Sequence, residues 1–202
     1  MLKRVVDIIV SAAGLVVLAP LFALVAFAIK LDSKGPVFFR QERIGRGFRK
    51  FLIYKFRTMS PDAPQRGGPL TSAGDPRITR LGGVLRKTKI DELPQLINVF
   101  RGDMTLVGPR PEVSRYVDLF RSDYEEILRV RPGITDLASL KYRDEASLLG
   151  RADDPEREYL TRVLPDKIAL AKEYVRRSSF VFDMTLILKT IVKISASGSE
   201  RL

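Results

Sequence analysis

An uncharged apolar run near the N-terminus constrains this chain most. No charged residue occurs between Ile8 and Ile29, and basic residues flank the run, with Lys3 and Arg4 before it and Lys30 after it. A helix needs roughly 20 apolar residues to cross the hydrocarbon core of a bilayer. The run is therefore long enough to enter or span a membrane.

A cleaved signal peptide is the first alternative. Ala26-Phe27-Ala28 matches a cleavage pattern, and the start of the chain is basic. The apolar core of a signal peptide is only about 7–15 residues long, however, and Asp7 stands directly beside this longer run. We therefore interpret residues 1–33 as a membrane helix that is retained.

Pro20 lies inside the run and should bend the helix. Proline has no backbone N–H, and its ring displaces the carbonyl of Val16. A bent helix can enter one leaflet and return to the same face, which would keep Lys3, Lys30 and Lys34 in the cytoplasm, as the positive-inside tendency favours. On these residues alone, an ordinary kinked transmembrane helix is an equal alternative.

Charge and composition narrow the chemistry. Lys and Arg number 35 against 24 Asp and Glu, a net charge of +11, which favours a nucleic acid, an anionic membrane or a phosphorylated substrate as the partner. The chain has neither histidine nor cysteine, which excludes thiolate nucleophiles, histidine bases and zinc sites of the usual kinds. Any catalysis must use carboxylates, Lys, Arg, Tyr, Ser, Thr or a bound metal.

Beyond the apolar run, residues 34–202 are predicted to form one compact α+β domain that is mostly helical. Residues 35–59 are predicted to form a β-hairpin around Gly45-Arg46-Gly47. The Pro- and Gly-rich segment from Ser60 to Asp75 is expected to be a mobile surface loop, either a lid or a plain connector. Helices are predicted over 78–89, 93–100, 112–130, 156–177 and 180–194.

The last predicted helix is amphipathic. Lys189 and Lys193 share one face, and the other face carries apolar residues: Phe180, Met184, Leu188 and Ile191. Such a helix can lie in the membrane interface beside anionic lipids. Packing on the core as an ordinary surface helix is an equal alternative.

Two adjacent acids, Asp91 and Glu92, follow a basic stretch that includes Arg86. Asp91 is predicted to be the N-cap of the next helix, and Pro94 is tolerated in its first turn. An ionised carboxylate beside cations can bind a divalent metal or attack an electrophile as a covalent nucleophile. A capped, solvated helix start is the commoner explanation for acids at such a position.

Arg110 lies between Pro109 and Pro111, so its backbone is stiff. Arginine is the side chain best suited to bind phosphate through two hydrogen bonds. A rigid arginine, metal-capable acids and a membrane anchor together indicate phosphate chemistry at a bilayer surface.

Three stretches of the sequence carry a resemblance to a known family: "YKFRTM", "DPRITRLGGVLRKTKIDELPQLINVFRGDMTLVGPRP" and "VRPGIT". They resemble bacterial sugar transferases of the monotopic polyprenyl-phosphate phosphoglycosyl transferase family. The resemblance implies a re-entrant helix kinked at Pro20 and a catalytic domain on the cytoplasmic face of the inner membrane, with interfacial amphipathic helices. It also implies transfer of a sugar 1-phosphate from a nucleotide sugar, usually UDP-linked, to polyprenyl (undecaprenyl) phosphate, releasing UMP.

The resemblance also implies roles for residues. Asp91 falls on the family's nucleophile, which would form an aspartyl-phosphosugar intermediate, and Glu92 would ligate metal or assist the second step. Mg²⁺ is expected at Asp91 and Glu92, because hard cations prefer oxygen ligands. The cations expected around the phosphates are Lys55, Arg57, Arg86 and Arg110.

The expected partners are a UDP-sugar, polyprenyl phosphate and anionic lipids, without nucleic acid; the oligomeric state stays open, a dimer included. Ala19 stands where family members often have serine, and the segment from Asp136 to Ala146 departs from the family pattern, so no donor sugar is assigned. The alternative function is a non-catalytic, membrane-tethered basic module that binds anionic polymer. It explains the charge and the anchor, but not the acidic pair or Arg110.

Overall fold

The computed structural model describes residues 2–68 and 70–199. The first residue of the predicted segment 1–33 and the last residues of the predicted segment 34–202 lie outside this range. Helices α1 (Leu2–Val17) and α2 (Ala19–Asp32) are bent by 58° relative to each other. No single described helix is long and apolar enough to cross a membrane, whereas the bent pair is, judged by length and composition.

The bend at the predicted proline is confirmed. Pro20 falls in the first turn of α2. Because it lacks an N–H, it cannot donate to the carbonyl one turn earlier, and the regular pattern is interrupted there. Leu18 still donates to the Gly14 carbonyl at 2.9 Å, and Phe22 donates to the Leu18 carbonyl at 2.8 Å, so the two helices join without a loop.

The predicted hairpin is also confirmed. Strands β1 (Phe38–Ile44) and β2 (Lys50–Phe56) pair antiparallel, with Phe38 opposite Phe56. The connection contains a short 3-10 turn, η1 (Arg46–Phe48), in which Gly47 has φ 64°. Glycine adopts this left-handed conformation at no steric cost.

The described residues of the segment from Ser60 to Asp75 are irregular apart from the 3-10 turn η2 (Ala63–Gln65). The side chain of Arg77 holds this segment together. Its guanidinium donates to the carbonyls of Gly68 and Leu70 at 3.0 Å each and is paired with Asp75 at 2.7 Å. The segment therefore folds around one buried side chain.

The next helices agree with expectation at their centres. They are α3 (Arg80–Thr88), the 3-10 turn η3 (Ile90–Glu92) and α4 (Gln95–Arg101). The single helix predicted over 112–130 is wrong: α5 (Ser114–Leu119) and α6 (Arg121–Ile127) are separated by a break at Phe120. The apolar spacing runs through this break, so tertiary packing rather than the local pattern determines it.

The helix predicted over 156–177 has three parts that follow one another directly. They are α9 (Pro155–Glu158), a π-helical segment η4 (Tyr159–Val163) and α10 (Leu164–Arg177). Pro165 cannot donate an α-helical hydrogen bond, and its neighbour Leu164 donates to Tyr159, five residues back. The proline thus accounts for the local change of helix type.

A second, parallel strand pair was not predicted. It joins β3 (Thr105–Val107) to β4 (Gly133–Thr135). A Cβ on Gly133 would lie 2.1 Å from the backbone nitrogen of Gly108, so only glycine permits this close approach. The short helices α7 (Leu137–Lys141) and α8 (Glu145–Leu149) follow β4.

The last helix, α11 (Phe180–Ser199), packs on the core through Leu186, which is fully buried. The predicted division of its faces is partly wrong. Met184 lines a large cavity, and Lys193, although exposed, donates to the Leu140 carbonyl. Val181 and Leu188 are exposed.

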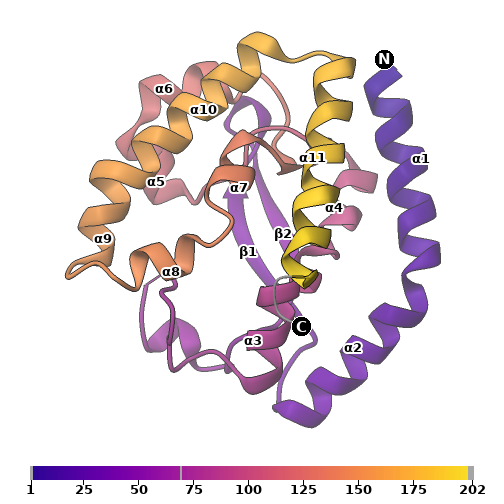
Figure 1. Cartoon of the computed structure of the whole chain (residues 1–202), viewed down its shortest axis with the longest axis vertical. Coiled ribbons are helices and arrows are strands. Elements are labelled where there is room, and N and C mark those ends of the chain that lie inside the picture. Colours follow the sequence, from indigo (N-terminus) through magenta and orange to yellow (C-terminus); the bar gives the residue numbers. More distant parts are fainter. Residues whose placement is uncertain (1, 69, 200–202) are drawn as a thin grey trace.

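The mostly helical α+β class is confirmed, with the hairpin at the centre of the molecule (Figure 1). Helices α5, α6, α9 and α10 lie on one side of it, and α1, α4 and α11 lie on the other. The end of α2 packs on β2 and α3 through a small core of Val25, Ile29, Phe56 and Leu85.

Candidate active site

Asp91 occupies a position other than the predicted helix cap. Lys89 ends α3 in the left-handed region, with φ 61°, and the chain then forms η3, which contains both acids. Pro94, not Asp91, is the N-cap residue of α4. The prediction fails because both acids belong to a 3-10 turn that precedes the α-helix.

The Asp91 side chain lines a large cavity and is only 6% exposed. Within residues 2–68 and 70–199, its Oδ1 atom has no hydrogen-bond partner. Burial raises the pKa of Asp91, and the neighbouring Lys55 opposes that rise. The site thus holds a carboxylate whose charge the protein itself satisfies incompletely.

Glu92 has a contrasting environment. Its Oε1 accepts from Lys55 Nζ at 2.8 Å and also from Arg110 Nη2. Burial alone would raise the pKa of Glu92, but Arg110 and Lys55 outweigh burial and hold it well below the usual range. Burial lowers the pKa of Lys55, against the attraction of Glu92. Glu92 is therefore a fixed negative charge that holds two cations at the cavity wall.

A hydrogen bond from its backbone positions Arg110, in addition to the prolines on either side of it. Its N–H donates to Asp136 Oδ2 at 3.1 Å, and Asp136 Oδ1 accepts from the Ser139 N–H at 2.7 Å. Asp136 therefore caps α7 and fixes Arg110 with the same carboxylate. The sequence reasoning missed this role, although an aspartate directly before a helix start is a recognisable capping signal.

Arg86 and Arg57 prove to be differently placed. Arg86 lines the cavity, where its Nε donates to Thr58 Oγ1 at 2.8 Å, and burial lowers its pKa against the pull of Asp91. The guanidinium of Arg57 instead donates to the carbonyls of Lys34 and Ser33, at 2.7 Å each. These bonds tie the end of α2 to the hairpin. Arg57 also lines the same cavity, so its expected role around the phosphates stays a prediction.

Glu112, which was not predicted as a site residue, also lines the cavity and forms several contacts in its wall. It is buried and accepts from the Tyr159 hydroxyl at 2.7 Å. Burial would raise its pKa, but Lys167 and Arg43 outweigh that and lower it. This network holds the backbone directly after Pro111 and so supports Arg110 from its other side.

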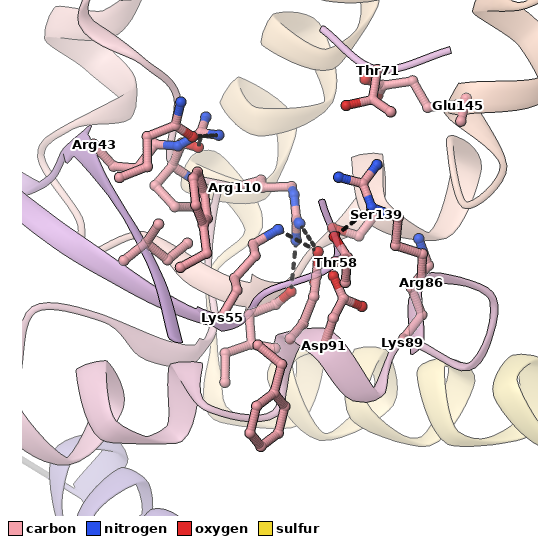
Figure 2. Close-up of a pocket in the computed structure, with 18 of the residues that line it drawn as sticks. Arg43, Lys55, Thr58, Thr71, Arg86, Lys89, Asp91, Arg110, Ser139 and Glu145 are labelled. Atoms are coloured by element: carbon pink, nitrogen blue, oxygen red, sulfur yellow. Dashed lines mark hydrogen bonds and ion pairs between the residues drawn. The ribbon is translucent and has the colours of Figure 1, made fainter. Parts of the chain in front are cut away.

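Together these residues enclose a cavity of about 2160 Å³. Lys55, Arg86, Asp91 and Arg110 lie around one part of it (Figure 2). Residues of the loop after β2, from Ser60 to Thr71, form part of its wall. The arrangement suits a polyanionic ligand held against a buried carboxylate whose Oδ1 is unpartnered within the described chain.

The donor set fits a hard divalent cation. No group of three or more acidic, His or Cys ligands occurs within residues 2–68 and 70–199. Mg²⁺ commonly uses only one or two carboxylates and completes its shell with water and substrate phosphates. Asp91 Oδ1, buried and unpartnered within the described chain, is the oxygen that meets this requirement.

The chain also matches known proteins. A model of the bacterial sugar transferase family matches residues 1–197. A UDP-N-acetylgalactosamine-undecaprenyl-phosphate N-acetylgalactosaminephosphotransferase from Aeromonas hydrophila is 41% identical, over 99% of this chain and 45% of that protein. A UDP-glucose:undecaprenyl-phosphate glucose-1-phosphate transferase from Caulobacter vibrioides is 39% identical, over 94% and 68%.

The exopolysaccharide production protein PSS from Rhizobium leguminosarum bv. phaseoli is 40% identical, over 98% of this chain and 96% of its own length. The chain thus spans less than half of the Aeromonas relative and almost all of the Rhizobium one. The chain belongs to the bacterial sugar transferase family.

Proposed function

We propose that this protein transfers a sugar 1-phosphate from a UDP-sugar to polyprenyl phosphate and releases UMP. The observation that carries this proposal is the buried Asp91 carboxylate, with Oδ1 unpartnered within the described chain, on a cavity that Lys55, Arg86 and Arg110 also line. The names of relatives that act on UDP-sugars and undecaprenyl phosphate support it.

The reaction proceeds in two displacements at one phosphorus atom. Asp91 attacks the phosphorus that bears the sugar, the bond from this phosphorus to the bridging oxygen breaks, and UMP leaves with that oxygen. An oxygen of the lipid phosphate then attacks the same phosphorus, and the bond to Asp91 breaks. A covalent intermediate lets the water-soluble donor and the membrane-bound acceptor react in turn.

The other residues of the site prepare this attack. Lys55 and Arg110, held by Glu92, present positive charge toward a diphosphate that would otherwise repel the carboxylate. Asp91 would hold Mg²⁺, with Glu92 close by, and the ion would neutralise phosphate charge. Glu92 serves chiefly to position the two cations.

We further propose that α1 and α2 form a re-entrant membrane hairpin on the cytoplasmic face of the inner membrane. Lys3 Nζ donates to the Val107 carbonyl at 2.8 Å and pairs with Asp183 at 2.7 Å. Asp7, which is buried, accepts from Thr105 Oγ1 at 2.7 Å. Both ends of the bent pair therefore contact the same domain, and a spanning helix would have to break the contacts of its first turns.

Labelling tests this topology. Met1, the position suggested by the sequence, lies outside the described residues, whereas the neighbouring Leu2 is exposed. A cysteine at either position should react with a membrane-impermeant reagent only when the cytoplasmic side is open. Labelling from outside intact cells would establish a spanning helix instead.

A half-reaction tests the chemistry. Wild-type protein given a UDP-sugar without lipid should release about one UMP per active site, and its intact mass should rise by one sugar phosphate on the Asp91 peptide. UMP that appears only after polyprenyl phosphate is added would mean direct transfer. A protein without catalysis, such as the basic module considered above, would release no UMP under either condition.

A further inference from the structure

The active-site cavity has an apolar arm that the phosphate chemistry does not use. Besides the charged residues around Asp91, its lining includes side chains from α1, α4, β3 and α11. We define the apolar arm by these residues: Val6, Val10, Leu96, Leu106, Met184 and Ile187. All of them retain some exposure, although Leu106 and Ile187 also pack on their other side against the core around Val107, Tyr174 and Leu186.

Two helices form the sides of this arm. Figure 1 shows α1 and α11 next to each other, with α4 near α1, and the ion pair between Lys3 and Asp183 joins the two helices near their N-terminal ends. From there the lining residues advance along both helices, from Val6 to Val10 and from Met184 to Ile187. The arm therefore continues from the catalytic cavity to the helix that is proposed to enter the membrane.

The polar groups beside the arm already have partners inside the protein. Asp7 accepts from Thr105 Oγ1 and from the Leu106 N–H. The hydroxyls of Thr135 and Thr190 bond to each other at 2.7 Å. A sugar or a nucleoside placed here would lose hydrogen bonds to water without replacing them, which disfavours the polar donor as the occupant.

We propose that the apolar arm binds the first isoprene units of the polyprenyl phosphate acceptor. This proposal rests on the proposed function, because the phosphate of the same lipid must reach the cations around Asp91. The cavity matches such a ligand in charge and polarity: cations at one part, aliphatic side chains at the other. The outer faces of both flanking helices carry exposed apolar residues, such as Ile9 and Leu188, so the arm adjoins a surface that bilayer lipid can cover.

Adjacent residues on each helix provide matched variants. Ile187→Asn places an amide in the arm, and Leu188→Asn makes the same change on the exposed face of α11. Val10→Asn and Ile9→Asn form the corresponding pair on α1. Each pair alters membrane-exposed helices similarly, so only the cavity variant should affect chain recognition.

The expected result separates acceptor binding from chemistry. With a long-chain acceptor, Ile187→Asn should raise KM roughly tenfold, the size expected for losing about one aliphatic contact site. With methyl phosphate as the acceptor, which carries no isoprene unit, KM should be unchanged relative to wild type. The release of UMP from UDP-sugar alone should also be unchanged, because that step precedes acceptor binding.

A direct measurement does not require turnover. A polyprenyl phosphate with a diazirine on its second isoprene unit should crosslink to peptides of α1 and α11, and Ile187→Asn should reduce this signal while Leu188→Asn should not. Equal KM changes in both members of a pair, or crosslinks confined to other peptides, would overturn the proposal. The protein could also crosslink through α1 and α11 but release no UMP from any UDP-sugar. This result would contradict the proposed function and still support lipid binding in the apolar arm.

Discussion

Asp91→Asn and Glu92→Gln should both reduce activity but change stability in different directions. The two residues are adjacent, and each substitution removes one negative charge. Their surroundings differ, however, because Glu92 binds Lys55 and Arg110 whereas Asp91 Oδ1 is unpartnered within the described chain. Stability thus reports what each carboxylate does for the fold, independently of catalysis.

The magnitude for Glu92 follows from its two partners. Its side chain is 16% exposed, and those of Lys55 and Arg110 are 20% and 26% exposed. Removing one member of a buried ion pair costs about 3–5 kcal/mol, and we expect the lower end because glutamine keeps an acceptor oxygen. For a chain of this length, a loss of about 3 kcal/mol lowers Tm by roughly 6–12 °C.

Asp91 should behave in the opposite way. Burial raises its pKa, so the ionised carboxylate is disfavoured in the folded state, and this penalty is present above the folded pKa. Asparagine carries no charge and escapes the penalty. Asp91→Asn is therefore expected to leave the free energy of unfolding unchanged or to increase it by about 1 kcal/mol.

Thermal unfolding of the purified variants in one detergent at neutral pH would measure these differences. Glu42→Gln is a suitable control, because Glu42 makes an exposed ion pair with Lys50 on the same hairpin, and such pairs contribute about 0–1 kcal/mol. The reasoning would be refuted if Glu92→Gln unfolded at the wild-type temperature, or if Asp91→Asn lost as much stability as Glu92→Gln. Intact-mass measurement on the same samples should find the phosphosugar adduct in wild type and none in Asp91→Asn.

Three further predictions follow from the same contacts. Because attack needs ionised Asp91 and burial raises its pKa, kcat/KM should fall as pH is lowered through a value above the ordinary 3.8, and a pH–rate profile whose acidic limb lies at or below 3.8 would contradict this. Chelation with EDTA should abolish activity and Mg²⁺ should restore it; full activity in excess EDTA would rule out the metal. Arg77→Ala should speed proteolytic cleavage within residues 60–76, because it removes the donors to the carbonyls of Gly68 and Leu70. Arg77→Lys should show partial protection. Cleavage of Arg77→Ala at the wild-type rate would show that the loop does not depend on this side chain.

Features encoded by local chemistry could be predicted from the sequence. Pro20 interrupts a helix wherever it stands in the middle of one, and glycines around Arg46 favour a hairpin connection. Lys55, Arg86 and Arg110 were named as cations for phosphate, and the structure brings all three to the lining of one cavity with Asp91. Residue type was sufficient for these inferences because charge and backbone geometry act at short range.

Features that depend on long-range contacts could not be predicted. Strands β3 and β4 have three residues each, too few for a periodic pattern, and they meet only after two intervening helices. Arg57 lines the cavity with the other cations, and its guanidinium also donates to two carbonyls at the end of α2. Side-chain chemistry alone cannot separate these two uses of an arginine.

The acidic pair illustrates how such ambiguity is resolved. Consecutive residues on a 3-10 helix point about 120° apart, so adjacent carboxylates in η3 meet different neighbours. Glu92 meets two cations and keeps them in place, while Asp91 remains without a protein partner for Oδ1 within the described residues. A strongly basic chain can thus gather cations for a polyanionic substrate with one acid and keep the other for the substrate itself. A single acid could not do both, because the ion pairs that stabilise a carboxylate also make it a weaker nucleophile.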